Sequence, residues 1–389
     1  MSNNDPFGKW WPCLRKHFKR TQIWLPRAME LTEHLDGQRP FRYFTLCGRP
    51  MIDVYMLVKE KVLRVDDTGR RILGVAFCEL DKEVFPEMIE LIGVEESGFR
   101  AKLEEIILFS DIPETQPLDT MAALEGYLEG EGEGLNATLR EAIENKRRHL
   151  LFRSLFPFDF LNLDFCDRYY GIPPDVLQVN MAIERLLEWQ RQPGKKSNGA
   201  PFSIGRFVLA ITCRVENKLT SATSTRLANF VGENVHTHAE YKAALQLRGI
   251  NNVTKWSVEE PLDFFMSTWP KEIARLALMK QWDIKVHDHA FYDRVSDSGE
   301  AYHMVCLVVE FTQAPICSTY LAAATQSLDQ SGRTEIRKIE PTDTDGKRLL
   351  ADLRQIVNLR NKQAKRAGRE ELPEPLSEIN RLKGEGVPI

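Results

Sequence analysis

Short apolar segments alternate with amphipathic stretches along most of the chain. Five of the apolar segments are rich in β-branched and aromatic residues, as strands covered on both faces by helices are. They are residues 41–48, 71–81, 104–111, 158–165 and 205–215. The stretches between them, such as 81–93 and 174–192, have the hydrophobic spacing of helices that pack one face against a sheet. The alternation predicts an α/β fold with a parallel, doubly wound sheet.

The last two apolar segments predict a different connection. Residues 282–294 and 301–311 are separated by only a few polar residues, too few for the crossover that parallel strands need. We therefore expect an antiparallel hairpin there. The predicted fold is a Rossmann-like sheet of five parallel strands with a C-terminal antiparallel hairpin, and with helical additions at both ends.

Composition excludes several classes of protein. Hydrophobic residues make up 43% of the 389 residues and charged residues 28%, which is ordinary for a chain with a buried core. The net charge of −4 excludes a polycation that coats nucleic acid with its whole surface. The N-terminus has no apolar segment of a signal peptide, and no run approaches the roughly 20 apolar residues of a membrane span. We expect a cytoplasmic protein without membrane contact.

Cysteine and histidine give little sign of a metal site. The seven cysteines are an odd number without a CxxC pair, so neither a disulfide framework nor a cysteine zinc site is expected. Reduced thiols fit a cytoplasmic setting. The His-x-His pairs 236/238 and 287/289 could point two rings to one face of a strand, but we interpret these four histidines as solvent-facing and predict no bound metal.

The pattern divides the chain into three parts. Residues 1–40 form an N-terminal helical arm in which aromatic and basic residues alternate, 41–312 form the α/β domain, and 313–389 form a charged helical tail. The tail carries the bases Arg354, Arg360, Lys362, Lys365, Arg366 and Arg369. The arm and the tail are each interpreted as packed helices with solvated bases, and the alternative for each is a contact with nucleic acid. A protein partner is also compatible with this pattern.

Five parallel strands followed by an antiparallel hairpin resemble the fold of class I S-adenosylmethionine-dependent methyltransferases, over about residues 40–312. The segment TLCGRPMIDVYML after the first strand is similar to the cysteine-and-proline loop of RNA cytosine-5 methyltransferases, with Cys47 and Pro50 at matching places. The resemblance implies that Cys47 and Gly48 contact S-adenosylmethionine. Where that family has a glycine pair after the proline, this chain has Met51 and Ile52.

The resemblance also implies roles for two acidic residues at strand ends. Glu79, at the end of the second strand, would accept the ribose hydroxyl groups of the cofactor, with Asp81 as the alternative. Asp111, after the third strand, would contact the adenine amino group. The corresponding structural interpretations are a helix-capping acid and a turn-forming aspartate.

Candidate catalytic residues follow the fourth and fifth strands. Asn162 and Asp164 stand where amino methyltransferases place an acidic or asparagine residue. Cys166 and Cys213 are similar to the catalytic thiols of cytosine-5 enzymes, in which a thiolate adds to the pyrimidine ring and a carboxylate assists proton transfer. The structural alternative is that both cysteines are small buried hydrophobic residues.

Three functions remain open from the sequence. The first is a methyltransferase-like protein that uses S-adenosylmethionine and acts on nucleic acid. The second is a catalytically inactive version of the fold that serves as a binding or scaffold subunit of a bacterial multi-protein system, which would explain the absent glycines. The third is a different enzyme on the same fold that binds another adenine nucleotide. The segment after the first predicted strand distinguishes these functions, because Arg49, Met51 or Tyr55 could fill the space that the cofactor needs.

Overall fold

A computed structural model gives the arrangement of most of the chain. It describes residues 14–35, 39–46, 51–79, 85–94, 97–100, 150–168, 178–195, 199–216, 219, 221–295, 301–314, 337–340, 342–366, 368, 371, 373–377 and 380. The predicted strand at 104–111 lies outside these residues.

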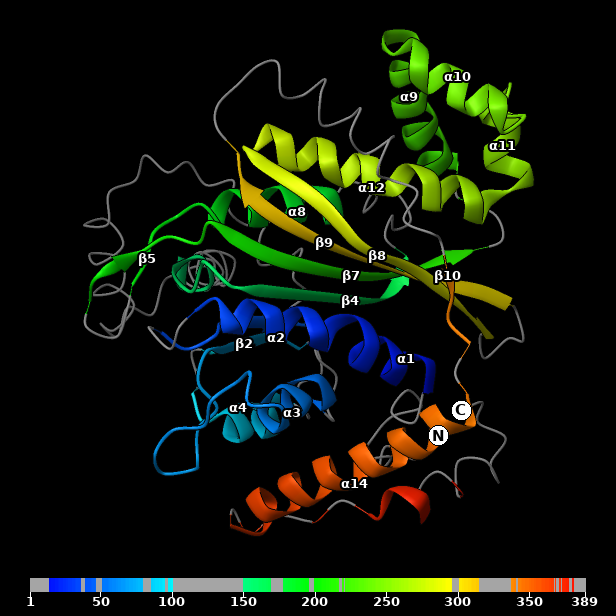
Figure 1. The fold of residues 1–389 in the computed structure, drawn as a ribbon. Coiled ribbons are helices and arrows are strands. Elements are labelled where there is room, and N and C mark those ends of the chain that lie inside the picture. The colour runs from blue at the N-terminus through cyan, green and yellow to red at the C-terminus, as the bar shows by residue number, and fades with distance from the viewer. Residues whose placement is uncertain are drawn as a thin grey trace, which may run out of the picture.

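A single large sheet forms the centre of the described part of the chain (Figure 1). Its eight strands lie in the order β10-β8-β9-β7-β4-β1-β2-β3. Their bounds are β1 Tyr43–Thr45, β2 Val75–Cys78, β3 Gly98–Phe99, β4 Phe160–Arg168, β7 Arg206–Glu216, β8 Trp282–Val295, β9 Ala301–Gln313 and β10 Arg337–Lys338. A separate two-stranded ribbon pairs β5 Gly194–Lys195 with β6 Pro201–Phe202.

Strand pairing confirms the predicted α/β class and the closing hairpin. The pairs β1–β2, β2–β3, β1–β4 and β4–β7 are parallel, whereas β9 is antiparallel to both of its neighbours, β7 and β8. The predicted number of strands was too low, because β10 adds an eighth strand beside β8. This two-residue strand comes from the C-terminal segment, whose polar sequence gave no strand signal. The architecture is a mostly parallel mixed sheet compatible with a Rossmann-like fold.

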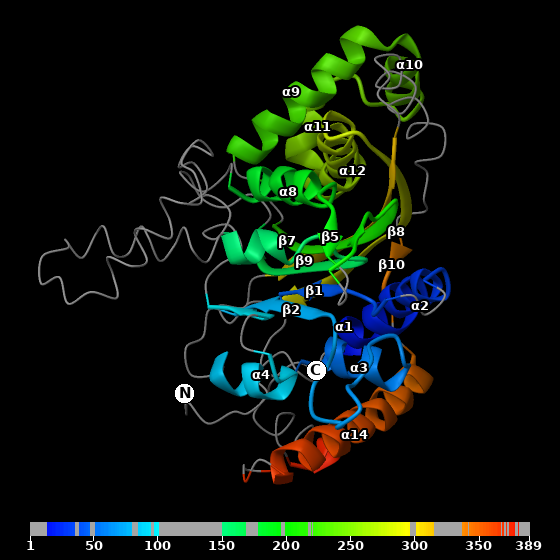
Figure 2. The same ribbon diagram turned by 90° about the vertical axis from the view of Figure 1, so that its left-hand side faces the viewer.

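Helices cover both faces of the sheet (Figure 2). One face packs against the N-terminal helices α1 Leu14–Lys19, η1 Arg20–Trp24 and α2 Leu25–Glu33, together with α3 Ile52–Lys59, α4 Phe85–Ile92 and α14 Asp343–Arg366. The other face packs against α8 Gln178–Trp189 and α12 Pro261–Met279. Alternation along β7 shows the two-layer core: Val208 and Ala210 face the first group of helices, and Leu209 and Ile211 face the second.

Three further helices form a lobe on the α12 side of the sheet, beyond α12 (Figures 1 and 2). They are α9 Ser221–Thr237, α10 Ala239–Leu247 and α11 Val253–Glu259, inserted between β7 and α12. Leu227 and Val231 of α9 join the core on the α12 side, so the lobe is anchored by apolar packing. No helix in the described part of the chain is both long and apolar enough to cross a membrane.

Both ends of the described chain meet on one face of the sheet. Nε2 of His17 in α1 lies 3.1 Å from Oδ2 of Asp352 in α14, and Nζ of Lys59 in α3 lies 2.6 Å from Oδ1 of the same aspartate. The side chain of Asp352 therefore links α14 to two helices that are far from it in the sequence, α1 and α3.

Candidate functional site

The order of the strands locates a crevice between β1 and β4. The chain leaves β1 toward β2 on one side, and β4 lies on the other side, so the direction of winding reverses at β1. Open α/β sheets bind ligands at the carboxyl ends of the strands at such a switch point. Thr45, the last residue of β1, pairs with Asn162, and β4 continues beyond it. Asn162 and Asp164 therefore lie at the end of β4 beside this switch point, and both side chains are buried.

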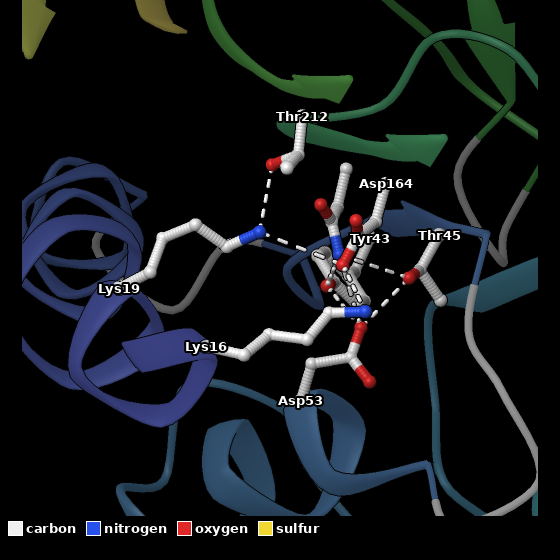
Figure 3. A network of polar contacts seen from close by, with 8 residues as sticks. Lys16, Lys19, Tyr43, Thr45, Asp53, Asp164 and Thr212 are labelled. Carbon is white, nitrogen blue, oxygen red and sulfur yellow. Dashed lines mark hydrogen bonds and ion pairs between the residues drawn. The ribbon is translucent and has the colours of Figure 1, made fainter. Parts of the chain in front are cut away.

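Four polar side chains meet at the end of β1 (Figure 3). Oδ2 of Asp53 accepts hydrogen bonds from the Tyr43 hydroxyl at 2.6 Å and from the Thr45 hydroxyl at 2.7 Å. The Asn162 amide donates to the same oxygen at 3.2 Å. Burial, together with the nearby Asp53 carboxylate, raises the pKa of Tyr43 well above its usual value. Tyr43 is therefore a neutral hydrogen-bond donor to a buried carboxylate.

The local sequence explains this arrangement. Tyr43 and Thr45 are two residues apart on a strand, so both side chains point to the same face of the sheet. Asp53 lies in the first turn of α3, where the helix dipole favours a negative charge. Asp53 is therefore an acidic residue at the N-terminus of a helix.

A second group of buried charges surrounds Asp164 (Figure 3). Nζ of Lys16 lies 2.9 Å and Nζ of Lys19 3.5 Å from Oδ2 of Asp164. Lys19 also donates a hydrogen bond of 2.7 Å to the hydroxyl of Thr212 on β7, and its ammonium group lies 4.4 Å from the centre of the Trp24 ring. The N-terminal helix thus places two cations against the carboxylate of β4.

The Lys19 ammonium group is fully buried, at 0% exposure. Burial lowers the pKa of Lys19, and the charge of Asp164 opposes this shift. Burial alone would raise the pKa of Asp164, but the charges of Lys16 and Lys19 outweigh it and hold the pKa well below its usual range. Asp164 is therefore ionised at neutral pH, and its charge compensates the buried lysine.

Two buried oxygen atoms of the crevice accept no hydrogen bond from any described residue. They are Oδ1 of Asn162 and Oδ1 of Asp164. A buried acceptor without a donor costs about 1–3 kcal/mol. The two atoms are therefore unused hydrogen-bond acceptors inside the fold.

The structure brings together some of the predicted site residues and separates another. Asn162 and Asp164 share one face of β4, above α3 and the N-terminal helices. Cys213 is fully buried in the core on the opposite face, toward α12, because it is one residue out of phase with Thr212 on β7. Cys213 therefore lies on the opposite face of the sheet from Asn162 and Asp164. The side chain of Cys166 lies outside the described part, as do Cys47, Gly48 and Asp111.

Glu79 follows β2 directly, at the neighbouring strand end. Its backbone N–H donates to the carbonyl of Phe99 at 3.0 Å, and its side chain is partly buried. The placement at the carboxyl end of β2 agrees with the position that the sequence predicted. Its role in holding ribose hydroxyl groups stays a prediction.

Sequence reasoning missed the lysines that cover the crevice. Lys16 and Lys19 were interpreted as solvated bases of the arm, but they are 12% and 0% exposed at the side chain. Their spacing of three residues places both on one helical face, which was the available signal. The strand residue that pairs with these lysines is determined by tertiary structure, so it could not be inferred from the local sequence pattern.

The interpretation of one histidine pair was also wrong. His289 is 4% exposed and faces α12, with its ring centre 6.5 Å from that of Trp269. His287 is partly buried, and its Nε2 lies 2.7 Å from a carboxylate oxygen of Glu310. The strand that carries them, β8, is covered on both sides, so neither ring faces solvent freely.

Comparisons with known proteins give no family for this chain. The chain matches no protein-family model, and it matches no curated protein. Within the described residues, no group of three or more histidine, cysteine, aspartate or glutamate side chains is arranged to hold a metal ion.

The residue before α3 adopts an unusual backbone conformation. Met51 has φ 47° and ψ 36°, in the left-handed region, and its side chain is 1% exposed. This is the first of the two positions at which the methyltransferase resemblance implies glycine. A residue with a side chain pays about 1–2 kcal/mol for this conformation, and glycine does not. Buried packing of the Met51 side chain thus compensates for strain in the backbone.

Substitution of Met51 gives a direct test of this strain. Although both variants lose the buried side chain, we expect Met51→Gly to be more stable than Met51→Ala by about 0.5–1 kcal/mol, because glycine relieves the left-handed strain. Urea unfolding measures the difference. Met56 is a matched control within the helix, where Met56→Gly should be less stable than Met56→Ala by about 1 kcal/mol. If the alanine variant were more stable than the glycine variant at both positions, the backbone at Met51 would not be strained.

Proposed function

We propose that this protein is an S-adenosylmethionine-dependent methyltransferase-like protein that acts on nucleic acid. The observation that carries the proposal is the strand order, in which five parallel strands run β3-β2-β1-β4-β7 and the antiparallel β9 lies between β7 and β8. This arrangement agrees with the combination of parallel strands and closing hairpin for which the sequence resembles class I methyltransferases. The crevice at β1 and β4 is then the position for the cofactor.

The ends of β2 and β4 carry hydrogen-bond acceptors of the kind that such a ligand needs. S-adenosylmethionine carries hydrogen-bond donors on its amino group, ribose and adenine, and when bound it supplies an activated methyl group. Glu79 offers a carboxylate for the ribose hydroxyl groups at the end of β2. The unpaired oxygens of Asn162 and Asp164 offer two more acceptors at the end of β4. In this proposal these two side chains accept hydrogen bonds from the target group and orient it, and the thiol of Cys213 on the other face takes no part.

A second candidate is a binding or scaffold subunit without catalysis. Lys16 and Lys19 favour it, because their charges compensate Asp164 and their side chains pack over the end of β4. Met51 and Tyr55, at the start of α3, are each 1% exposed and pack in the core. A scaffold needs the sheet and the packed helices but not an open pocket.

Calorimetry with S-adenosylmethionine separates the two candidates. We expect micromolar binding to the wild-type chain, weakened by about 1–3 kcal/mol in Glu79→Ala, as loss of hydrogen bonds to a charged group should produce. Glu259→Ala, on the exposed side of α11, is the matched control and should bind as the wild type does. Absence of binding heat at millimolar cofactor would overturn the methyltransferase proposal and favour the scaffold.

A further inference from the structure

Most of the exposed residues of helix α14 are basic. Between 346 and 366 the chain has seven lysines and arginines and one acidic residue, Asp352, which is buried. Six of the seven bases are exposed, and only Arg360 is buried. The exposed bases are Lys347, Arg348, Arg354, Lys362, Lys365 and Arg366. This concentration contrasts with a chain whose net charge is −4.

The bases form a continuous stripe. Lys347, Arg354, Lys362 and Lys365 follow one another at intervals of seven, eight and three residues, which return to the same side of an α-helix. From Lys347 to Arg366 the helix rises about 28 Å at 1.5 Å per residue. Arg354 keeps one partner, Glu374, in an exposed ion pair of 2.7 Å. The stripe is long enough to follow several successive phosphate groups.

A neighbouring turn extends the basic surface. The guanidinium group of Arg366 lies beside Gly69 in the turn between α3 and β2. Residues 61–71 contain four bases and two acids, and all four bases are exposed. These bases are Lys61, Arg64, Arg70 and Arg71. One of the acids, Asp66, is already engaged by the backbone N–H groups of Arg70 and Arg71.

The described part of the N-terminal arm does not present Lys16 and Lys19 as exposed bases. Lys16 and Lys19 point inward and pair with Asp164, so their charges are compensated within the fold (Figure 3). The two segments that the sequence suggested for nucleic-acid contact therefore differ: six of the seven bases of α14 are exposed, and these two lysines of the arm are not.

We propose that the exposed face of α14, together with residues 61–71, is a binding surface for the phosphate backbone of duplex nucleic acid. Lysine and arginine side chains bind phosphate oxygens by charge-assisted hydrogen bonds, and binding releases counterions from the duplex. Neither segment contains phenylalanine, tyrosine or tryptophan. Single-strand binding usually depends on aromatic side chains that stack on bases, so this composition favours a duplex.

This surface is separate from the crevice at β1 and β4, and the inference does not require methyl transfer. If S-adenosylmethionine does not bind and duplex does, the methyltransferase proposal fails alone. If the cofactor binds and duplex does not, only the present inference fails.

The test is the fluorescence anisotropy of a labelled duplex of about 20 base pairs, titrated with the full chain at salt concentrations from 50 to 200 mM. Wild-type affinity should fall with salt, with a slope of about −0.9 for each phosphate contacted. The variant Lys362→Glu/Lys365→Glu/Arg366→Glu should bind at least about 30-fold more weakly, with a slope reduced by about 2.7, because three contacts are lost.

A matched variant distinguishes the effect of this local basic surface on duplex affinity from the effect of the net charge of the protein. Lys242→Glu/Lys255→Glu/Arg275→Glu changes the charge by the same amount at exposed positions of the helical lobe and of the adjoining helix α12. It should retain wild-type affinity, and circular dichroism should show that both variants are folded. The inference would be overturned by an equal loss of affinity in the two variants or by no wild-type binding at 50 mM salt. It would also be overturned if a single strand bound more tightly than the duplex, or if polyglutamate bound equally well.

Discussion

Replacing Asp164 by alanine is expected to lower the free energy of unfolding by about 3–5 kcal/mol, because the change leaves a buried lysine without its counter-charge. Lys19 is 0% exposed, and besides Asp164 its ammonium group has the Thr212 hydroxyl at 2.7 Å. Urea unfolding of the wild type and the variant at pH 7 gives the difference. The ionised Asp164 contributes stability at neutral pH that is lost as the pH falls below the ordinary aspartate range.

A second substitution identifies the cause of that loss. If the unpaired charge of Lys19 is responsible, Lys19→Met added to Asp164→Leu should recover most of the stability, since apolar replacements of a buried ion pair are often neutral. Glu259→Ala, which breaks the exposed pair with Lys255, should cost at most about 0.5 kcal/mol. A double variant as unstable as Asp164→Ala would show that the loss arises from packing and not from charge.

The second large effect is expected from His289 under mild acid. Burial lowers the pKa of His289 to about 3, from 6.5 in the unfolded chain. Between these values the unfolded chain binds a proton that the folded chain does not, so stability falls as the pH decreases. From pH 7.5 to pH 4.5 this residue should cost about 2.7 kcal/mol, at 1.36 kcal/mol for each pH unit below 6.5.

The variant His289→Leu removes this contribution while keeping an apolar side chain beside Trp269. Its stability relative to the wild type should rise by about 2.7 kcal/mol between pH 7.5 and pH 4.5 in urea unfolding experiments. His17 and His287, whose pKa values burial also lowers, contribute equally to both proteins and cancel in the comparison. His303→Gln, at a partly exposed histidine paired with Asp293, is the control. A constant difference across this pH range would exclude His289 as the source.

The sheet could be predicted from the sequence because its signal is local. The segments 158–165, 205–215 and 282–294 are rich in apolar, β-branched and aromatic residues, and the structure has β4, β7 and β8 at these places. The short polar gap before residue 301 was enough to infer that β8 and β9 are antiparallel. By contrast, β10 has two residues, Arg337 and Lys338, and no such pattern can exist in so short a strand.

The candidate site was predicted only in part. Asn162 and Asp164 were found because strand ends are recognisable and ligands bind there. The lysine partners of Asp164 were not found. Lys16 and Lys19 precede Asn162 and Asp164 by more than 140 residues and look like the solvated bases of any amphipathic helix. The inward direction of these lysines is decided by packing of the N-terminal helices on the sheet. Tertiary contacts of this kind leave no local trace in the sequence.

The meeting of α1 and α14 also affects how the chain can fold during its synthesis. His17 and Asp352 are 335 residues apart. At about 5–20 residues per second, a ribosome would add the partner roughly 17–67 s after the histidine. During that interval α1 can reach β4 and β7 but not α14. The N-terminal helix is therefore fully enclosed only when nearly the whole chain has left the ribosome, and nascent chains shorter than about 350 residues should leave this helix open to proteases and chaperones.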